Sequence, residues 1–251
     1  MILLCNDDGF NAEGLRVLRK ELLALDDVTI VAPEKEQSAM GHAITLNQPL
    51  KVRRVEEEGE FIGYAVEGTP ADCVKLAITV LLEKPPQLVV SGIKLGGNLG
   101  ICALYSGTVS AATESMVMGV PSIAVSLDTY ENPDFKPAAR FTRKFIPQLL
   151  EKRLPEGVFL NINVPPVPES EFAGVAITRQ GKSRVIEEFD CRKDPRGKTY
   201  YWLAGEMLFE ETEEGADCVM VAKNYISLAP IHFDLTHYPS LDNLKDWKIK
   251  F

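Results

Sequence analysis

Two adjacent carboxylates near the start of the chain are the strongest sign of chemistry in the sequence. Asp7 and Asp8 stand in the segment Asn-Asp-Asp-Gly at 6–9, and the glycine permits the turn that would let both side chains converge. Carboxylates this close repel each other unless a cation lies between them, and hard oxygen ligands suit Mg²⁺ or Mn²⁺. The same four residues are also compatible with a simple acidic turn that binds nothing.

A second candidate segment is the polar loop over 33–42. Most connections between a strand and the next element have only about two to six residues, and longer ones are often functional. Ser38 could supply a neutral oxygen ligand from this loop, or it could simply face solvent. His42, at the end of the loop, could line the same site.

The third candidate segment is rich in glycine and leads toward a predicted helix. Residues 91–100 contain four glycines and Asn98, so backbone N–H groups and a side-chain amide could approach an anion. Ser106, Gly107 and Thr108 then begin the helix, and small residues with free amides at a helix N-terminus form a phosphate site. A glycine-rich loop alone is a weak signal, which the Asp pair strengthens.

Short apolar runs alternate with stretches of helical periodicity along the chain. The strands and helices that these stretches predict position the three candidate segments. The alternation is typical of an α/β protein with a mostly parallel sheet, in which ligands bind at the carboxyl ends of the strands. Each of the first three apolar runs is followed by one candidate segment, so we expect the three to meet at one edge of the sheet.

Asn11 is the expected N-cap of the first helix, and Pro147 is expected to kink or divide the last one. The expected strands lie at 2–5, 28–32, 87–90, 121–127 and 158–164, an antiparallel hairpin at 51–55 and 61–66, and helices at 15–25, 69–82, 109–118 and 137–153.

The pattern changes after residue 165, so we divide the chain into an α/β core over 1–165 and a C-terminal part over 166–251. The strand that ends at Val164 is the expected last strand of the core. The C-terminal part could pack as an arm on a second subunit or could cover its own core. Its expected strands lie at 175–178, 199–203 and 217–222, and the arm includes the aromatic residues Tyr200, Tyr201, Trp202 and Phe209.

Composition, charge and motif spacing exclude several classes of protein. The chain has 251 residues, 45% hydrophobic and 25% charged, and no apolar run reaches the roughly 20 residues of a membrane-spanning helix. A net charge of −9 without a basic stripe argues against a nucleic acid polymer as partner. Five scattered cysteines and the lack of a signal peptide favour the cytoplasm. No G-x-G-x-x-G, H-E-x-x-H or G-x-S-x-G motif is present, and His232 and His237 are interpreted as structural.

The motifs, in their order and spacing, resemble those of the SurE family, survival proteins that act as metal-dependent nucleotidases. The likeness covers residues 1 to about 130 and continues into the C-terminal part, and the combination is highly specific. The matching pieces are Asn6-Asp7-Asp8-Gly9 with Gly14, Ala32-Pro33 through Ser38 and Gly41-His42, Gly68-Thr69-Pro70-Ala71-Asp72-Cys73, Val90-Ser91-Gly92-Ile93 with Gly96 and Asn98, Tyr105-Ser106-Gly107-Thr108-Val109, and Thr178-Arg179-Gln180-Gly181.

The resemblance implies a three-layer, Rossmann-like α/β fold whose C-terminal arm is exchanged between the subunits of a homodimer or homotetramer. It implies a cytoplasmic phosphatase that releases phosphate from nucleoside 5′- and 3′-monophosphates, with short polyphosphate as a further substrate of some members. Asp7, Asp8 and Ser38 would hold one divalent ion, Mg²⁺ or Mn²⁺, in each subunit, and the two aspartates would be catalytic. Neither a membrane nor a nucleic acid polymer would be a partner.

A further set of residues is expected to bind the phosphate group of the substrate. They would hold the phosphoryl oxygens as charge shifts in the transition state, while the ion neutralises part of that charge. The attacking group is either a metal-activated water or an Asp carboxylate, and the sequence leaves both open. The expected phosphate-binding residues are Asn6, Lys94, Asn98, Ser106, Gly107 and Thr108.

Lys94 is the position at which the sequence departs from the family. The family's fourth metal ligand is the asparagine of Ser-Gly-Ile-Asn, whereas an ammonium group has three donors and no acceptor. Lys94 could turn outward into solvent, or its head could enter the site and repel or replace the ion. We expect the inward orientation, because two adjacent carboxylates attract the ammonium. A nucleotide- or phosphate-binding protein with impaired hydrolysis is therefore the alternative to an active nucleotidase.

Overall fold

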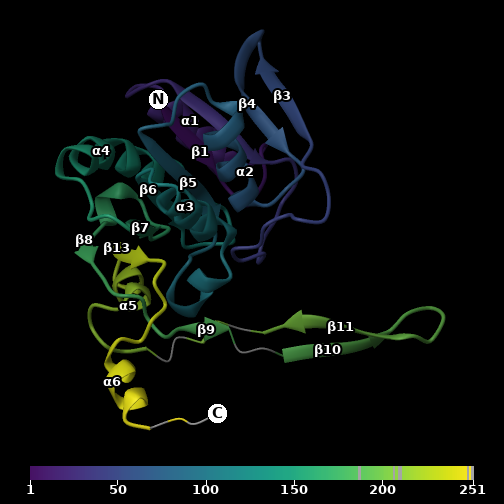
Figure 1. Ribbon diagram of the computed structural model, residues 1–251, viewed down its shortest axis with the longest axis vertical. Helices are drawn as coiled ribbons and strands as arrows, with labels where there is room; N and C mark the ends of the chain where they lie inside the picture. Colours follow the sequence, from purple (N-terminus) through teal and green to yellow (C-terminus); the bar gives the residue numbers. More distant parts are fainter. Residues whose placement is uncertain (186–187, 206, 209–210, 248, 250–251) are drawn as a thin grey trace.

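A nine-stranded sheet forms the centre of the computed structural model, which describes residues 1–185, 188–205, 207–208, 211–247 and 249 (Figure 1). In sheet order, the strands are β3 (Val52–Glu57), β4 (Glu60–Val66), β2 (Val28–Pro33), β1 (Ile2–Cys5), β5 (Leu88–Leu95), β6 (Ser122–Leu127), β7 (Val158–Val164), β13 (Tyr225–His232) and β8 (Gly174–Ile177). Neighbours from β4 to β7 are parallel, whereas β3 runs antiparallel to β4 and β13 antiparallel to β7. The expected mostly parallel sheet and the expected hairpin are confirmed.

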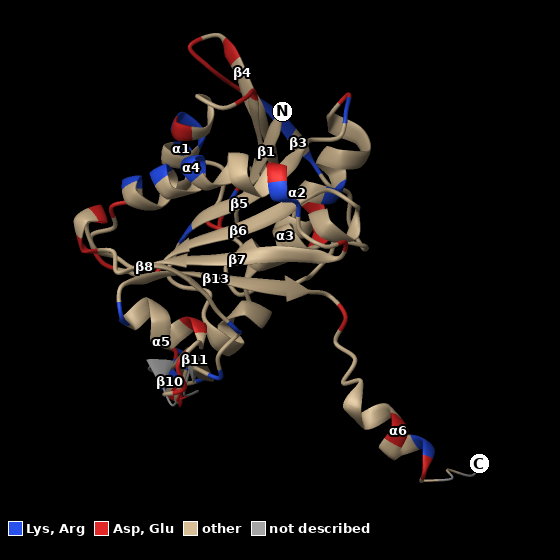
Figure 2. Cartoon of the chain, turned by 90° about the vertical axis from the view of Figure 1, so that its left-hand side faces the viewer, with Lys and Arg blue, Asp and Glu red and all other residues tan. Residues whose placement is uncertain are grey.

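Helices cover both faces of the sheet, so the core has three layers, as expected (Figure 2). One pair of helices packs together on each face, and each pair contacts the central strands. The pairs are α1 (Glu13–Leu22) with α4 (Lys136–Lys152), and α2 (Pro70–Leu76) with α3 (Gly107–Val117); a π-helical turn over Ala77–Leu81 continues α2.

The order of the strands reverses between β1 and β5. The chain runs from β1 to β2 and then to β4 on one side, and it crosses to β5 on the other side of β1. In an open α/β sheet, ligands bind outside the carboxyl ends of the strands at such a reversal. Alternate residues of β1 are buried in the two opposite cores, Ile2 and Leu4 in one and Leu3 and Cys5 in the other. Burial on both faces therefore fixes the place of the residues that follow β1.

Two expectations for the C-terminal part are wrong. The strand that ends at Val164 is not the last of the main sheet, because β13 pairs with β7 and β8 pairs with β13. The segment 217–222 is helix α5 (Asp217–Ala222) and not a strand. A short apolar run is compatible with either element, and periodicity alone does not distinguish them.

The N-cap expected for the first helix differs from the structure, and the last helix is not divided. Asn11 does not cap the first helix, because Ala12 is the residue before α1 and Asn11 accepts a hydrogen bond from Arg16 instead. Pro147 lies inside α4, which continues through it as one helix of 17 residues. The missing N–H of a proline thus does not divide this helix, whose buried face packs on the sheet and on α1.

The rest of the C-terminal part projects from the three layers as a hairpin and a tail (Figure 1). Tyr201 and Trp202, near the middle of the hairpin, are more than 60% exposed, and Phe209 lies outside the described residues. No helix in the described part of the chain is long and apolar enough to cross a membrane. The elements are the hairpin of β10 (Glu188–Lys193) and β11 (Thr199–Ala204), the short pair β9 (Arg184–Val185) and β12 (Met207–Leu208), and the tail helix α6 (Pro239–Lys245).

Candidate functional site

A pocket of about 570 Å³ opens at the carboxyl ends of β2, β1, β5 and β6, where the strand order reverses. Residues from all three candidate segments line it, which confirms that these segments meet at one edge of the sheet. The expected site residues among its lining are Asp7, Asp8, Ser38, Lys94, Asn98 and Ser106.

Asp7 is held rigidly beside this pocket. It is 0% exposed, and its Oδ1 accepts a hydrogen bond of 2.5 Å from the hydroxyl of Thr108. Gly107 permits this close approach, since a Cβ at that position would lie 2.7 Å from the Cβ of Asp7. The second carboxylate oxygen, Oδ2, is buried without a hydrogen-bond partner. A buried oxygen of this kind is suited to a cation.

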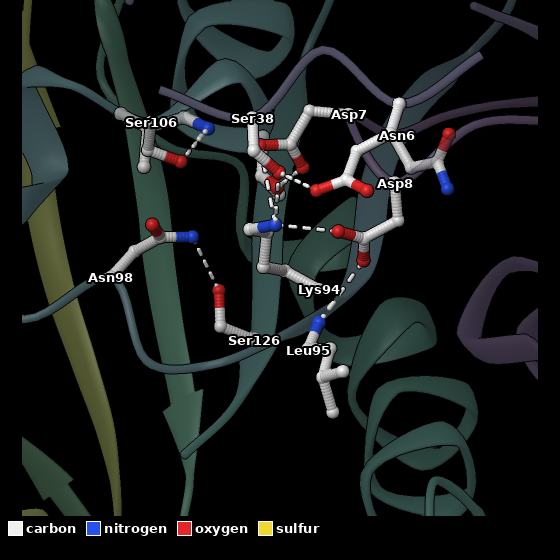
Figure 3. Close-up of polar contacts among 12 residues, drawn as sticks. Asn6, Asp7, Asp8, Ser38, Lys94, Leu95, Asn98, Ser106 and Ser126 are labelled. Atoms are coloured by element: carbon white, nitrogen blue, oxygen red, sulfur yellow. Dashed lines mark hydrogen bonds and ion pairs between the residues drawn. The ribbon is translucent and has the colours of Figure 1, made fainter. Parts of the chain in front are cut away.

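The ammonium group of Lys94 lies where the oxygens of Asp7, Asp8 and Ser38 converge (Figure 3). Its Nζ is 2.5 Å from Oδ1 of Asp8, 3.2 Å from Oγ of Ser38 and 3.6 Å from Oδ2 of Asp7. The backbone N–H of Leu95 donates to Oδ2 of Asp8 at 3.1 Å and fixes that carboxylate further. The inward orientation that the sequence predicts for Lys94 is confirmed.

Burial and charge act in opposite directions on this cluster. Burial raises the pKa of Asp7 above its ordinary value of 3.8, and the charge of Lys94 counteracts only part of that rise. Burial also disfavours the charged form of Lys94, but Asp7 and Asp8 outweigh it, so the pKa of Lys94 is raised above 10.5. The ammonium therefore stays charged at neutral pH and compensates the carboxylates around it.

The arrangement of oxygens suits a cation. Carboxylate and hydroxyl oxygens are hard donors of the kind that Mg²⁺ and Mn²⁺ prefer, and Oδ2 of Asp7, which has no hydrogen bond and lies 3.6 Å from Nζ of Lys94, offers one buried ligand position. Among the described residues, no three His, Cys, Asp or Glu side chains gather as a ligand set, so a metal here depends on Ser38 beside the two aspartates. Lys94 has no acceptor to offer as a fourth ligand. A divalent ion and the ammonium would thus compete for the same oxygens.

The N-terminus of α3 reaches the pocket at its N-cap residue, Ser106. Ser106 is the N-cap of this helix of 11 residues, and its Oγ accepts a hydrogen bond of 3.1 Å from the N–H of Val109. The first N–H groups of a helix lack partners within the helix, and the helix dipole makes this end partly positive. A phosphate group bound between this end and Lys94 would meet positive charge on both sides.

Several residues expected to contact phosphate are engaged by the protein itself. Asn6, Gly107 and Thr108 are not part of the pocket lining, and Nδ2 of Asn6 donates to the carbonyl oxygen of Gly9 at 3.0 Å. Asn6 and Thr108 therefore make hydrogen bonds within the acidic turn at 6–9 and to Asp7, outside the pocket lining. Asn98 lines the pocket, but one hydrogen of its Nδ2 goes to Oγ of Ser126 at 2.7 Å (Figure 3). Its contact with phosphate stays a prediction.

His42 does not line the pocket, contrary to expectation. Its Nε2 lies 2.8 Å from Oε2 of Glu114 on α3, and Glu114 also accepts a hydrogen bond of 2.5 Å from Lys75. The bond to His42 is the main reason why the pKa of Glu114 is lowered. This interaction ties the loop over 33–42 to α3, and the same loop carries Ser38.

Glu36 and Tyr130 belong to the pocket but were not expected from the sequence. Glu36 accepts the hydroxyl hydrogen of Ser38 at 2.6 Å, which leaves the lone pairs of Ser38 for Lys94. Tyr130 stands in the loop after β6. Both residues follow the end of a parallel strand, so an inspection of every strand end, the fourth included, would have found them.

Known proteins resemble this chain over nearly its whole length. A family model described as "Survival protein SurE" matches residues 2–187. The chain is 55% identical over 247 residues to the 5′-nucleotidase SurE of Syntrophus aciditrophicus, which covers 97% of this chain and 92% of the relative. It is 48% identical over 248 residues to the 5′-nucleotidase SurE of Syntrophobacter fumaroxidans, with 99% of each chain covered. The crystal structure of the SurE protein from Aquifex aeolicus matches with a TM-score of 0.86 and 41% identity over 99% of both chains.

Proposed function

The chain belongs to the SurE family, and on that premise we propose that it is a phosphatase that hydrolyses nucleoside 5′-monophosphates to nucleoside and phosphate. The relatives named 5′-nucleotidase support this activity, because their identity to the chain extends over nearly its full length. The observation that carries the proposal is that Asp7, Asp8, Ser38 and Lys94 face one pocket together with Ser106, the N-cap of α3. We extend the proposal to nucleoside 3′-monophosphates and short polyphosphate, which present a similar terminal phosphoryl group.

In this proposal, the phosphoryl group of the substrate binds between the carboxylate cluster and the start of α3. The ammonium of Lys94 would bind its oxygens, and the partly positive N-terminus of α3, which reaches the pocket at Ser106, would help to stabilise the charge that moves in the transition state. Asp7, Asp8 and Ser38 would hold one divalent ion per subunit, Mg²⁺ or Mn²⁺, which neutralises phosphoryl oxygens when bound.

The side-chain contacts favour water over an aspartate as the attacking group. Both oxygens of Asp8 already accept hydrogen bonds, one from Lys94 and one from the N–H of Leu95. Asp7 is fully buried, and one of its oxygens is bound to Thr108. Of these two carboxylates, the one oxygen without a hydrogen bond is Oδ2 of Asp7, which faces Lys94 at 3.6 Å and would be occupied by the ion. A carboxylate nucleophile needs a free oxygen in line with the leaving group, so these contacts support direct attack by water.

Phosphate release from AMP, 3′-AMP, tripolyphosphate and p-nitrophenyl phosphate tests the proposal. The protein is first treated with EDTA and then assayed with and without added Mn²⁺ or Mg²⁺. We expect hydrolysis of AMP that depends on the added metal, because the ion supplies positive charge beside the phosphoryl group. Binding of AMP without release of phosphate under all conditions would instead support the alternative, a binding protein with impaired hydrolysis.

We also propose that the protein is a homodimer or homotetramer in which the C-terminal arm packs on another subunit. Tyr201, Trp202 and Leu203 of β11 are each more than 60% exposed on a hairpin that projects from the core (Figure 1). A cluster of large apolar side chains in water is unfavourable, and such clusters mark contact surfaces. Size-exclusion chromatography with light scattering should report the mass of two or four chains. A monomer at micromolar concentration would remove this part of the proposal.

A further inference from the structure

We propose that Tyr130 is the surface on which the pocket binds the nucleobase, and that it determines the preference for nucleotides over simple phosphate esters. This inference rests on the proposed nucleotidase function and adds a base subsite to it. The cluster of Asp7, Asp8, Ser38 and Lys94 acts on the phosphate end alone, and a phosphate group is the same in every monoester. Recognition of a nucleoside therefore needs a second region of the pocket.

The order of the strands places Tyr130 in the same pocket as the phosphate end, on the next strand end along the sheet. Asp7 and Asp8 follow β1, Lys94 lies at the end of β5, and Tyr130 follows β6, so the three positions succeed one another along the sheet. Neighbouring strands are about 4.8 Å apart, which separates the ends of β1 and β6 by about 10 Å. The ring of Tyr130 reaches back over Gly96, two residues after Lys94, so the base of a nucleotide bound at the carboxylate cluster would lie within reach of the ring.

Tyr130 lines the pocket, and its hydroxyl lies close to Gly96, where a Cβ would be 2.6 Å from the hydroxyl oxygen. Burial is the main reason why the pKa of Tyr130 is raised above 10.0, and the charges of Lys94 and Asp8 also act on this group. Tyr130 as a whole is nevertheless 71% exposed. The side chain thus lines the pocket while much of it stays exposed and open to a ligand.

The ring of Tyr130 is held in place from one side. It lies over Gly96, where a Cβ would be 2.5 Å from Cε1 and Cζ of the ring, so a residue with a side chain would displace it. The hydroxyl of Thr129 accepts a hydrogen bond of 3.1 Å from the N–H of Glu131 and fixes the turn around Tyr130. An aromatic ring that is fixed on one side and open on the other is suited to stack on a planar base.

The neighbours of Tyr130 in the pocket are consistent with recognition by stacking. Tyr105, Pro133 and Phe135 line the same pocket, and Tyr105 is 56% exposed. Stacking on aromatic side chains tolerates different bases, because every base has a π-face. The pocket would accordingly detect that a base is present more strongly than it detects which base it is.

Titration calorimetry with adenosine tests the base subsite independently of turnover, because adenosine carries the base without a phosphate. Tyr130→Ala should raise the Kd for adenosine about tenfold, which lies within the range measured for the loss of one base–aromatic stack, and Tyr130→Phe should restore it. Tyr130 is exposed, so neither change removes a core contact. A wild-type protein that does not bind adenosine, or a Kd that changes less than about twofold in Tyr130→Ala, would overturn the inference.

Steady-state kinetics separate a failure of this inference from a failure of the proposed function. The ratio of KM for AMP to KM for glycerol phosphate should rise about tenfold in Tyr130→Ala. Tyr238→Ala is the matched control, because it removes a tyrosine that is 62% exposed at the start of α6, and its ratio should equal that of the wild type. A wild-type protein that hydrolyses neither ester refutes the proposed function, whereas equal ratios in wild type and Tyr130→Ala refute the base subsite alone.

Discussion

Replacement of Asp7 or Asp8 by asparagine should lower kcat for AMP hydrolysis by about two orders of magnitude or more. Each change removes one negative charge from the oxygens that surround Lys94 and would hold the divalent ion. Asparagine keeps the size of the side chain, and its carbonyl oxygen can still accept the hydrogen bond from Thr108 at position 7. The loss of kcat would therefore result from the missing charge and not from altered packing. Titration with Mn²⁺ should show weaker metal binding in the same variants.

Thermal unfolding provides the structural control for these two variants. Asp7→Asn should unfold at an unchanged or higher temperature, because burial disfavours the ionised form of Asp7 and the change also relieves its repulsion with Asp8. Asp26→Asn is a matched substitution at the other end of β1, where Asp26 pairs with the N-terminal ammonium at 2.5 Å, and it should retain wild-type turnover. Near wild-type kcat in Asp7→Asn or Asp8→Asn would show that the metal site is assigned to the wrong residues.

Replacement of Lys94 by asparagine should strengthen the binding of Mn²⁺ at least about tenfold and raise metal-dependent turnover. Lys94 places a positive charge 2.5 Å from Asp8 and 3.6 Å from Asp7, where a divalent ion would have to bind. At an effective dielectric constant of about 20, two unit charges 4 Å apart repel by about 4 kcal/mol, and the double charge of the ion raises this to about 8 kcal/mol. The flexible stem lets the ammonium move away and lowers this value. Asparagine removes the repulsion and adds an oxygen ligand.

A second variant separates these two effects of the Lys94→Asn change. Lys94→Met removes the charge and adds no oxygen donor, so its affinity for Mn²⁺ should lie between those of the wild type and Lys94→Asn. The affinity is measured by calorimetric titration of the metal-free protein and does not depend on turnover. Equal affinities in wild type and Lys94→Asn would refute competition between the ammonium and the ion.

The place of the site could be predicted from the sequence because it depends on strand polarity. Parallel strands present their carboxyl ends at one edge of a sheet, so the polar segments after β1 and β2 and at the end of β5 had to meet there. Local patterns were sufficient for this step, since apolar runs and helical periodicity are read from neighbouring residues. Asp7, Asp8, Ser38 and Lys94 lie together in the pocket as this reasoning requires. The same reasoning, applied to the end of β6, would have included Tyr130.

Only the tertiary structure decided which groups within that edge bind one another. Thr108 was expected to face phosphate, but it donates to Asp7, which is 101 positions away in the sequence. Asn98 likewise gives one amide hydrogen to Ser126 on β6. A buried polar group binds the partner that the packed fold places nearest to it, because leaving it unpaired is unfavourable. Residue types and spacing do not contain that information.

The C-terminal part shows the same division between local and long-range causes. Its sequence determined that short β-rich segments follow the core, and the strand expected at 199–203 is β11. The sequence did not indicate β10, the hairpin partner of β11. The sequence did not determine that β13 enters the main sheet beside β7, or that 217–222 is helical. A strand is stabilised by the neighbours with which it pairs and packs, and those neighbours are distant in the chain. The fold class followed from local sequence patterns. Which strands belong to the main sheet, and which groups of the site hydrogen-bond each other, followed from contacts that form only when the chain is packed.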